Sequence, residues 1–461
     1  MKGDMLNGEA AAADGPNVDA AAAARETSFN VVVGDDIGQV KVVDFKKEGQ
    51  AQASAQAEGR KWGEPKVQRL ECGGSGGVNG TASKRSGAVV SVCALGDGEE
   101  AGSAYVVGRR SGQVDLLNAS EGTSTSLILC DSKEGRAKSD DGSPWDLLAV
   151  RRIESGLLTC TTRGIVESWD WKREEGPDSR PLPLTEASMR LETVKSSGPG
   201  GLGHPVEAFE VSGDGRIGTG GRENNLKVWD LETGTPVFLA RSPKPNELGI
   251  WDKPWITCMM FLPVSGETSA NGGGSLSSDV VLCGTANHQL RLYDARVKRR
   301  PVAELEWGEN KITSLCLDTP GVAEKIWCAN ATGQIHLLDL KMANGFSMAM
   351  STSLKGSLGC VRALTRHPTK PLAFSCGLDR YLRVYDLRKA RQISSVYLKQ
   401  YLTALAVVPE AEKETDSGEE GEGGPIGEEG AAPKARERRD DDEDEGAERE
   451  RPRKKKKSRK Y

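Results

Sequence analysis

The sequence has few of the residues on which metal sites and catalytic centres most often depend. It contains four histidines in 461 residues. None of them is spaced with another histidine, a cysteine or a carboxylate as a metal-ligand set requires. A phosphate-binding loop and an H-E-x-x-H motif are also missing from the sequence. We therefore predict no metal, no cofactor and no enzymatic activity.

Long apolar runs are missing as well. No stretch of 18 apolar residues occurs, so we expect no membrane span. Residues 1–27 are rich in alanine and carry five acidic residues. They have neither the apolar core of a secretory signal nor the arginines of a transit peptide. We predict that they form a disordered leader.

The ten cysteines are scattered along the chain and form no C-x-x-C pair. Most lie in apolar, strand-like runs, such as VVSVCAL around Cys93 and FSCG at Cys376. Free thiols used as small core residues are typical of proteins in a reducing, intracellular compartment. We therefore expect no disulfide framework.

What the sequence does contain is a repeat. Seven times a short apolar strand ends at an aspartate or asparagine, most clearly in GGRENNLKVWDLETG (residues 220–234) and RYLRVYDLRK (residues 380–389). The last three of these stop residues are separated by 45 and 47 positions, close to the length of a WD-repeat blade. The repeat predicts an all-β fold, a seven-bladed WD-repeat β-propeller over residues 28–409. The seven stops are Asp44, Asn118, Asp170, Asp230, Asp294, Asp339 and Asp386.

The end of the repeat region predicts how the ring closes. Each unit reads as a triplet of strands, but LTALAVVP (residues 402–409) resembles the first strand of a unit that has no partners of its own. We predict that it completes the first blade beside residues 30–33. Such pairing locks the ring and removes an exposed sheet edge.

Two positions within the units predict how the blades are held. We expect the aromatic residue before a stop (Trp169, Trp229, Tyr293, Tyr385) to pack between blades. Ordinary WD blades also carry an acidic residue seven positions before the stop, where it holds a tight turn. Here only the last unit has an aspartate at that position; the residues are Ile37, Ser111, Arg163, Glu223, Asn287, Thr332 and Asp379. We therefore expect divergent blades that buried polar networks hold only weakly.

Charge is divided unevenly along the chain. The net charge is −5, yet residues 410–450 carry 18 acidic and 6 basic residues, and residues 451–461 carry 8 basic residues and no acidic ones. Residues 1–409 are close to neutral, so their composition does not indicate a general nucleic-acid-binding surface. Both tail segments are poor in apolar residues, and we predict that residues 410–461 form a disordered tail, acidic and then basic.

The basic end of the tail predicts a nuclear or nucleolar import signal, with RNA contact as a secondary role. The acidic run at residues 440–445 is most simply a solvated spacer, and contact with basic partners such as ribosomal proteins is the alternative. The residues of the predicted signal are Arg451, Arg453, Lys454, Lys455, Lys456, Lys457, Arg459 and Lys460.

Two segments within the repeat region are candidate interaction sites. Before a predicted strand, Trp251 and Trp255 flank Asp252, Lys253 and Pro254. This segment is either a core plug under a loop or an exposed aromatic anchor at the propeller rim. The segment GGRENN (residues 220–225) is first a hairpin turn, and second a compact set of charged and amide groups on one face of the disc.

Four segments together resemble a known family. GGRENNLKVWDLETGTPVF, the IWD at residues 250–252, HPTKPLAFSCGLDRYLRVYDL and VYLKQYLTAL are similar to the nucleolar WD-repeat factors of large-ribosomal-subunit assembly. These include the yeast Nop-seven-associated WD protein and its animal WD-repeat counterpart. The resemblance covers roughly residues 29–409. Long insertions at 49–87 and 265–279 and the alanine-rich leader depart from the pattern.

The resemblance implies a non-enzymatic scaffold in the nucleus and nucleolus. Its implied partners are precursors of the large subunit (pre-60S particles) with their pre-rRNA, other assembly factors, and an NVL-type AAA-ATPase that releases it. In animals a link to the exosome-associated RNA helicase is also implied. The matching surface candidates are Arg222, Glu223, Asn224, Trp251, Asp252, Asp379 and Arg380, to which the motif adds Lys253.

One alternative function remains from the sequence. Substrate receptors of cullin-type ubiquitin ligases carry a stop followed by x-Arg, and this chain has YDAR and YDLR, ending at Arg296 and Arg388. The simpler interpretation is that these two arginines cover a blade edge.

Overall fold

The protein is a seven-bladed β-propeller, in which every element of the described residues is a β-strand. The computed structural model describes residues 28–409, and the predicted leader and tail lie outside this range. Within the range, the structure does not describe residues 47–63, 71–86, 96–103, 119–122, 130–145, 171–186, 195–203, 246–248, 250–252, 264–278 and 342–346.

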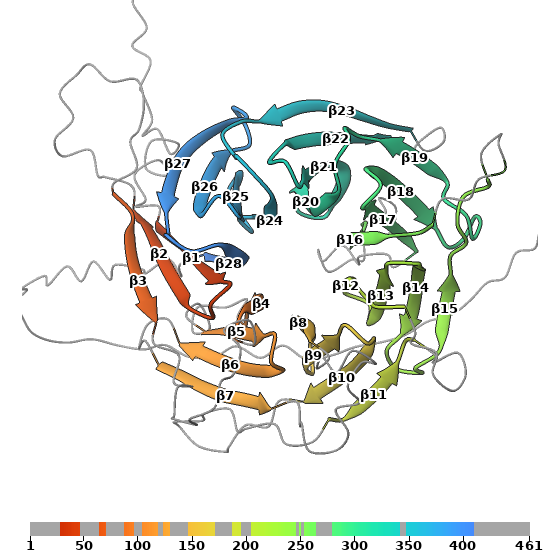
Figure 1. Cartoon of the computed structure of the whole chain (residues 1–461), viewed down its shortest axis with the longest axis horizontal. Helices are drawn as coiled ribbons and strands as arrows, with labels where there is room; N and C mark the ends of the chain where they lie inside the picture. The colour runs from red at the N-terminus through yellow and green to blue at the C-terminus, as the bar shows by residue number, and fades with distance from the viewer. Residues whose placement is uncertain are drawn as a thin grey trace, which may run out of the picture. The chain divides into compact units, whose positions relative to one another are not determined.

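Each blade is a four-stranded antiparallel sheet, and the seven sheets surround a central axis (Figure 1). From the axis outwards, blade 1 comprises β28 (Leu402–Pro409), β1 (Ser28–Asp35), β2 (Val40–Lys46) and β3 (Lys66–Leu70). Blade 2 comprises β4 (Val89–Ala94), β5 (Ala104–Arg109), β6 (Gln113–Asn118) and β7 (Thr123–Leu129). Blade 3 comprises β8 (Leu147–Arg152), β9 (Gly156–Thr161), β10 (Ile165–Asp170) and β11 (Met189–Glu192).

The remaining four blades repeat this order. Blade 4 comprises β12 (Ala208–Val211), β13 (Arg216–Gly221), β14 (Asn224–Asp230) and β15 (Pro236–Leu239). Blade 5 comprises β16 (Ile256–Phe261), β17 (Val280–Thr285), β18 (Gln289–Asp294) and β19 (Ala303–Glu306). Blade 6 comprises β20 (Ile312–Thr319), β21 (Val322–Asn330), β22 (Ile335–Lys341) and β23 (Ser347–Leu354). Blade 7 comprises β24 (Val361–Arg366), β25 (Leu372–Gly377), β26 (Tyr381–Asp386) and β27 (Arg391–Tyr397).

The last strand closes the ring as predicted. β28 pairs antiparallel with β1, with Val32 opposite Ala406 and Asn30 opposite Val408. β28 thereby occupies the innermost position of blade 1, which the first strand of the unit occupies in every other blade. The edge of β1 is therefore covered by the chain's own C-terminal strand.

Burial occurs between blades. The described residues form seven hydrophobic clusters, and each combines side chains from two neighbouring blades. Between blades 3 and 4, for example, Leu158 and Cys160 pack with Ile217 and Trp229. The aromatic residues before the stops are all buried in such clusters, which confirms their predicted role: Trp169, Trp229, Tyr293 and Tyr385. Each blade therefore depends on both neighbours for its stability.

The turn between the second and third strands is held from a different position than expected. In four blades, the last residue of the second strand accepts a hydrogen bond from the backbone N–H four residues later. The acceptors and distances are Asp35 (2.7 Å), Thr161 (3.2 Å), Thr285 (3.0 Å) and Asn330 (2.9 Å). All four stand nine residues before their stop, not seven. Four blades thus have a turn-holding side chain that the count of seven did not find.

The blades have a second regular feature. The residue three positions before each stop is polar in every unit, although it lies in the middle of an apolar strand. In five blades the structure pairs it with an opposite charge. These pairs are Lys41–Asp35 (2.9 Å), Asp115–Arg109 (2.8 Å), Glu167–Arg190 (3.5 Å), Arg291–Glu304 (2.9 Å) and Arg383–Asp379. Polar contacts in the blades are therefore periodic, like the apolar ones.

Candidate interaction surface

The predicted surface residues gather at one end of the blades. Because all seven sheets have the same strand order, their turns between second and third strands lie on one face of the ring, which we call the turn face. Each connection from an outer strand to the next inner strand reaches the same face. The turn face therefore carries Arg222, Glu223, Asp379 and Arg380 in turns, and Lys253 in the connection before β16.

Glu223 is the centre of a charged group between blades 4 and 5. Its backbone has a positive φ of 55°, and its N–H donates a 2.6 Å hydrogen bond to the carbonyl of Pro254. Lys253 donates to Glu223 Oε1 at 2.8 Å, and His204 Nδ1 lies 3.8 Å from Oε2. The hydrogen bond from Lys253 lowers the pKa of the Glu223 carboxyl. This group is exposed, so its ion pair orients side chains more than it stabilises the fold.

Trp255 adds an aromatic surface to this group. The Arg222 guanidinium lies 4.8 Å from the centroid of the Trp255 ring, and the Lys311 ammonium lies 6.0 Å from it. Trp255 Nε1 donates to Glu207 Oε2 at 2.7 Å. Trp255 is therefore a half-buried surface residue held in one orientation, not a core plug. Stacked arginine and tryptophan residues are frequent in recognition surfaces.

Three of the residues predicted to lie on the interaction surface are not among those that the structure places there. Asn224 begins β14 and is buried, with 5% of its surface exposed. Strand alternation turns its side chain inwards, so it does not belong to the accessible surface. Trp251 and Asp252 lie outside the described residues, as do the basic residues of the tail.

The second group lies on blade 7. Asp379 holds its own turn, since it accepts hydrogen bonds from the N–H groups of Tyr381 (3.3 Å) and Leu358 (3.2 Å) and pairs with Arg383. Arg380, with a φ of 68°, reaches away from that turn. It donates to the hydroxyl of Tyr401 at 3.2 Å, and its guanidinium lies 4.8 Å from the Tyr401 ring centroid. Asp379 is thus a structural residue, while Arg380 belongs to the surface.

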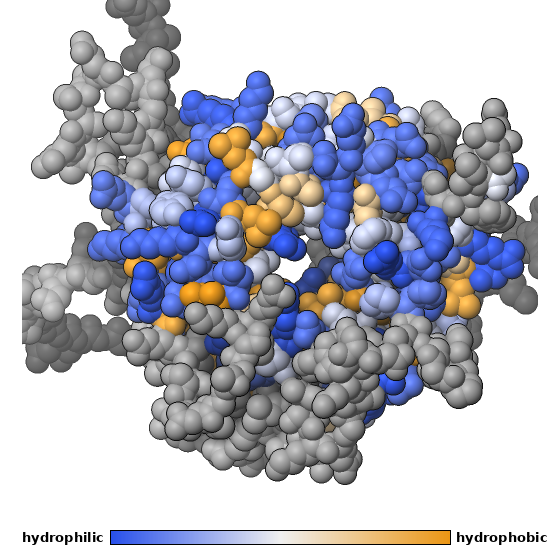
Figure 2. Space-filling model, in the orientation of Figure 1, coloured by the Kyte–Doolittle hydropathy of each residue, from blue (hydrophilic) through white to orange (hydrophobic). Residues whose placement is uncertain are grey.

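Around Arg380 the structure shows an apolar surface that the sequence did not reveal. Leu358 is 79% exposed, and Leu378, Tyr381, Tyr397 and Tyr401 are also exposed. Figure 2 shows hydrophobic surface near the central opening, over the sheet that contains β24 to β27. Tyr381 and Tyr397 are register partners on neighbouring strands, with ring centroids 5.1 Å apart. This pair of tyrosines could have indicated the surface from the sequence only if the register of β26 and β27 had been known.

The titratable and thiol groups of the described residues show the following chemistry. Among them, no three His, Cys, Asp or Glu side chains come close enough to hold a metal ion. Burial raises the pKa of Cys93 to about 11 and that of Cys376 to about 12, so both thiols stay protonated at neutral pH. No helix within the described ranges is long and apolar enough to cross a membrane.

Comparisons with known proteins agree with this architecture. No family model matches the sequence. The chain is 30% identical over 389 residues to WD repeat-containing protein 74 of Bos taurus, covering 84% of this chain and 82% of that protein. It is 31% identical over 325 residues to the Mus musculus protein of the same name, covering 70% and 72%. It is 28% identical over 224 residues to ribosome biogenesis protein NSA1 of Meyerozyma guilliermondii, covering 42% and 53%.

Proposed function

We infer that this chain, which belongs to the family of WD repeat-containing protein 74, acts in ribosome biogenesis. Its role is that of a non-enzymatic scaffold in the nucleolus, bound to pre-60S particles during assembly and pre-rRNA processing of the large subunit. The observation that carries this proposal is the similarity to a relative named as a ribosome biogenesis protein. The similarity to the bovine relative spans 84% of the chain, so it includes most of the propeller.

The turn face is the proposed docking side. It presents Arg222 stacked on Trp255, the Lys253–Glu223 pair and Arg380 with its tyrosines. Arginines and lysines supply contacts to phosphates or acidic proteins, and aromatic rings supply the desolvated area of an interface. Side chains held by their neighbours lose little conformational entropy on binding, which favours their use in an interface.

The tail and the remaining partners complete the proposal. Residues 451–460 provide nuclear and nucleolar targeting. An NVL-type AAA-ATPase releases the protein from the particle, and the exosome-associated RNA helicase is a further partner. Contact with pre-rRNA is direct or passes through neighbouring assembly factors.

Purification of the tagged full chain from cells tests this function. We expect large-subunit precursor rRNA to copurify with the protein, detected by hybridisation to internal spacer sequences. Deletion of residues 451–460 should reduce its nucleolar fraction by fluorescence microscopy. Recovery of soluble proteins without precursor rRNA, from a nuclear extract in which particles are intact, would contradict the role in assembly.

The structure gives no support to the ligase-receptor alternative. The Arg296 side chain is bound to its own stop residue, with Nε 3.0 Å from Asp294 Oδ1 and Nη2 3.0 Å from Oδ2. The backbone N–H of Arg388 likewise donates to Asp386 at 2.9 Å. These contacts fit arginines that cover the blade edge and close the turn after the third strand.

A further inference from the structure

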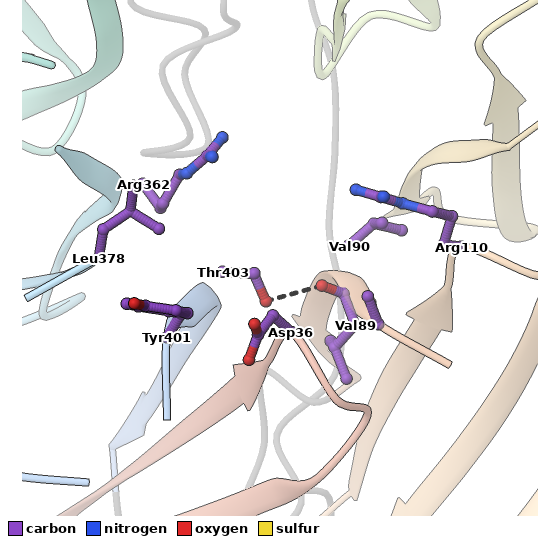
Figure 3. A pocket seen from close by; sticks show the side chains of 9 residues that line it. Asp36, Val89, Val90, Arg110, Arg362, Leu378, Tyr401 and Thr403 are labelled. Carbon is purple, nitrogen blue, oxygen red and sulfur yellow. Dashed lines mark hydrogen bonds between the residues drawn. The ribbon is translucent and has the colours of Figure 1, made fainter. Parts of the chain in front are cut away.

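A cavity opens on the turn face where the inner parts of blades 7, 1 and 2 meet. Its volume is about 360 Å³. Val90, Leu378 and Tyr401 supply accessible apolar surface to its wall, while Val89 is fully buried behind it. Figure 3 shows Arg362 and Arg110 extending from opposite sides towards the space above Asp36. The cavity adjoins the surface around Arg380, because Leu378 and Tyr401 belong to both.

The wall of the cavity is held by contacts between blades. Thr403 donates hydrogen bonds to the carbonyl of Val89 at 2.7 Å and to that of Gly34 at 3.2 Å. The first of these bonds is drawn in Figure 3. The N–H of Asp36 donates to the carbonyl of Tyr401 at 3.0 Å. The cavity therefore exists before any ligand arrives, which lowers the entropy cost of binding.

One polar atom of the wall lacks a hydrogen-bond donor among the described residues. Asp36 Oδ1 is buried and accepts no hydrogen bond from the residues that the structure describes. A buried acceptor without a donor is unfavourable by about 1–3 kcal/mol, and a ligand that donates a hydrogen bond relieves this cost. The N–H groups of a peptide backbone are donors of this kind.

The charges at the rim are the complement of an acidic ligand. Arg362 is exposed at the start of β24, and Arg110 is partly exposed, 3.5 Å from Asp146. Asp146 pairs with Arg110, so Arg362 is the rim cation that is open to an acidic ligand. Leu378 and Tyr401, which line the cavity, are both exposed. Apolar walls with a few polar groups at fixed positions are typical of sites that bury an anchor side chain.

We propose that this cavity binds a short acidic segment of a partner protein, with one large apolar side chain inserted between Val90, Leu378 and Tyr401. A carboxylate beside that anchor pairs with Arg362, and a backbone N–H donates to Asp36 Oδ1. A protein segment meets both features of the cavity, because an apolar side chain covers the wall and a backbone N–H reaches Asp36 Oδ1. This inference rests on the cavity alone and does not require the role in ribosome assembly.

The test uses the purified full chain and two labelled peptides in fluorescence anisotropy. The first peptide has a central Leu-Phe pair flanked by three glutamates on each side, and the second has lysines in place of the glutamates. We expect the acidic peptide to bind about tenfold more tightly than the basic one. Arg362→Glu should weaken the acidic peptide at least tenfold, as should Leu378→Asp. Arg388→Glu, the same charge reversal at an exposed position on the opposite face of blade 7, should leave binding unchanged.

Thermal melting checks that each variant is folded. If Arg362→Glu or Leu378→Asp does not fold, the milder variants Arg362→Gln and Leu378→Ser replace them. Equal binding of both peptides, or unchanged binding to Arg362→Gln, overturns the proposal. A labelled oligouridine that binds in place of the acidic peptide, and is lost with Arg362→Glu, overturns it in favour of RNA. Because no ribosomal particle takes part, these outcomes are independent of the copurification of precursor rRNA.

Discussion

Lys41 and Asp35 form an ion pair across the first hairpin of the propeller, with 2.9 Å between Nζ and Oδ2 and side chains only 3% and 1% exposed. Lys41 Nζ also donates to the carbonyl of Leu398 at 3.0 Å. Asp35 in turn holds its own turn through the N–H groups of Ile37 and Gln39. The pair therefore connects the first turn of the ring to the segment that leads into the closing strand.

We predict that Lys41→Ala lowers the free energy of unfolding by about 3 kcal/mol, because it leaves the Asp35 carboxylate buried without its partner. Urea denaturation followed by tryptophan fluorescence measures the change. Lys46→Ala, at the exposed end of the same strand, is the matched control and should cost less than about 0.5 kcal/mol. A similar loss of unfolding free energy in both variants would mean that the buried ion pair stabilises the fold no more than an exposed lysine does.

Removal of the closing strand should destabilise the whole ring. A chain ending at residue 401 loses the partner of β1 and the side chains of Leu402, Leu405 and Val407 from the cluster between blades 7 and 1. We expect a melting temperature at least about 10 °C lower and a tendency to aggregate through the exposed edge. A chain ending at residue 412 is the control. An unchanged melting temperature for the shorter chain would show that closure is not needed.

Stability should depend on pH through His367. This imidazole is fully buried, and its Nδ1 accepts hydrogen bonds from the N–H groups of Thr369 and Lys370. Burial, with Lys370 and Arg366 as further causes, lowers the pKa of His367 from 6.5 to about 4. Between these values the unfolded chain binds a proton that the folded protein does not. The free energy of unfolding therefore falls as the pH is lowered from 6.5 to 4, by about 1–3 kcal/mol from this residue.

Denaturation at several pH values, compared with His367→Asn, isolates that contribution. Asparagine keeps an acceptor oxygen for the turn but does not titrate. We expect a shallower pH dependence for the variant between pH 6.5 and 4. Parallel curves for the two proteins would rule out His367 as the source.

Charge reversal on the turn face should reduce binding to pre-ribosomal particles. Arg222→Glu together with Lys253→Glu removes the cation stacked on Trp255 and the partner of Glu223. We expect several-fold less precursor rRNA to copurify, while the melting temperature stays within a few degrees because the replaced side chains are exposed. Lys298→Glu with Lys389→Glu, on turns of the opposite face, is the control. Equal losses in both double variants would place the interface elsewhere.

The sequence was sufficient to predict the blade count and the closing strand, because each depends on a local signal. A stop residue marks the third strand of each unit, and residues 402–409 had no partner except the first hairpin. The sequence analysis considered only the position seven residues before the stop, where Asp379 does hold its turn, and so missed the acceptors nine residues before the stop. In blade 1 the strands end at Asp35 and restart at Val40, so the acceptor stands nine residues before Asp44.

The functional surface was harder to predict from the sequence than the fold. Arg222, Glu223 and Lys253 were grouped from two short segments, and the structure brings them together. Asn224 was wrongly predicted to lie on the surface. It follows the exposed Glu223 by one residue, and a shift of one residue turns a strand side chain to the opposite face. The tyrosine surface around Arg380 and the cavity below Arg362 combine residues from several strands. Their proximity follows from the register of strands within a blade and from the packing of neighbouring blades, which no local pattern records.

The pairing of β1 with β28 has a consequence for how the protein is made. Val32 emerges early in synthesis, but its partner Ala406 is added only near the end of the described chain. Throughout most of translation the first sheet lacks its inner strand, and an open strand edge of this kind is prone to pairing with other chains. A newly made chain therefore gains its final stability in one late step, and shielding of this edge by a chaperone is most needed just before that step.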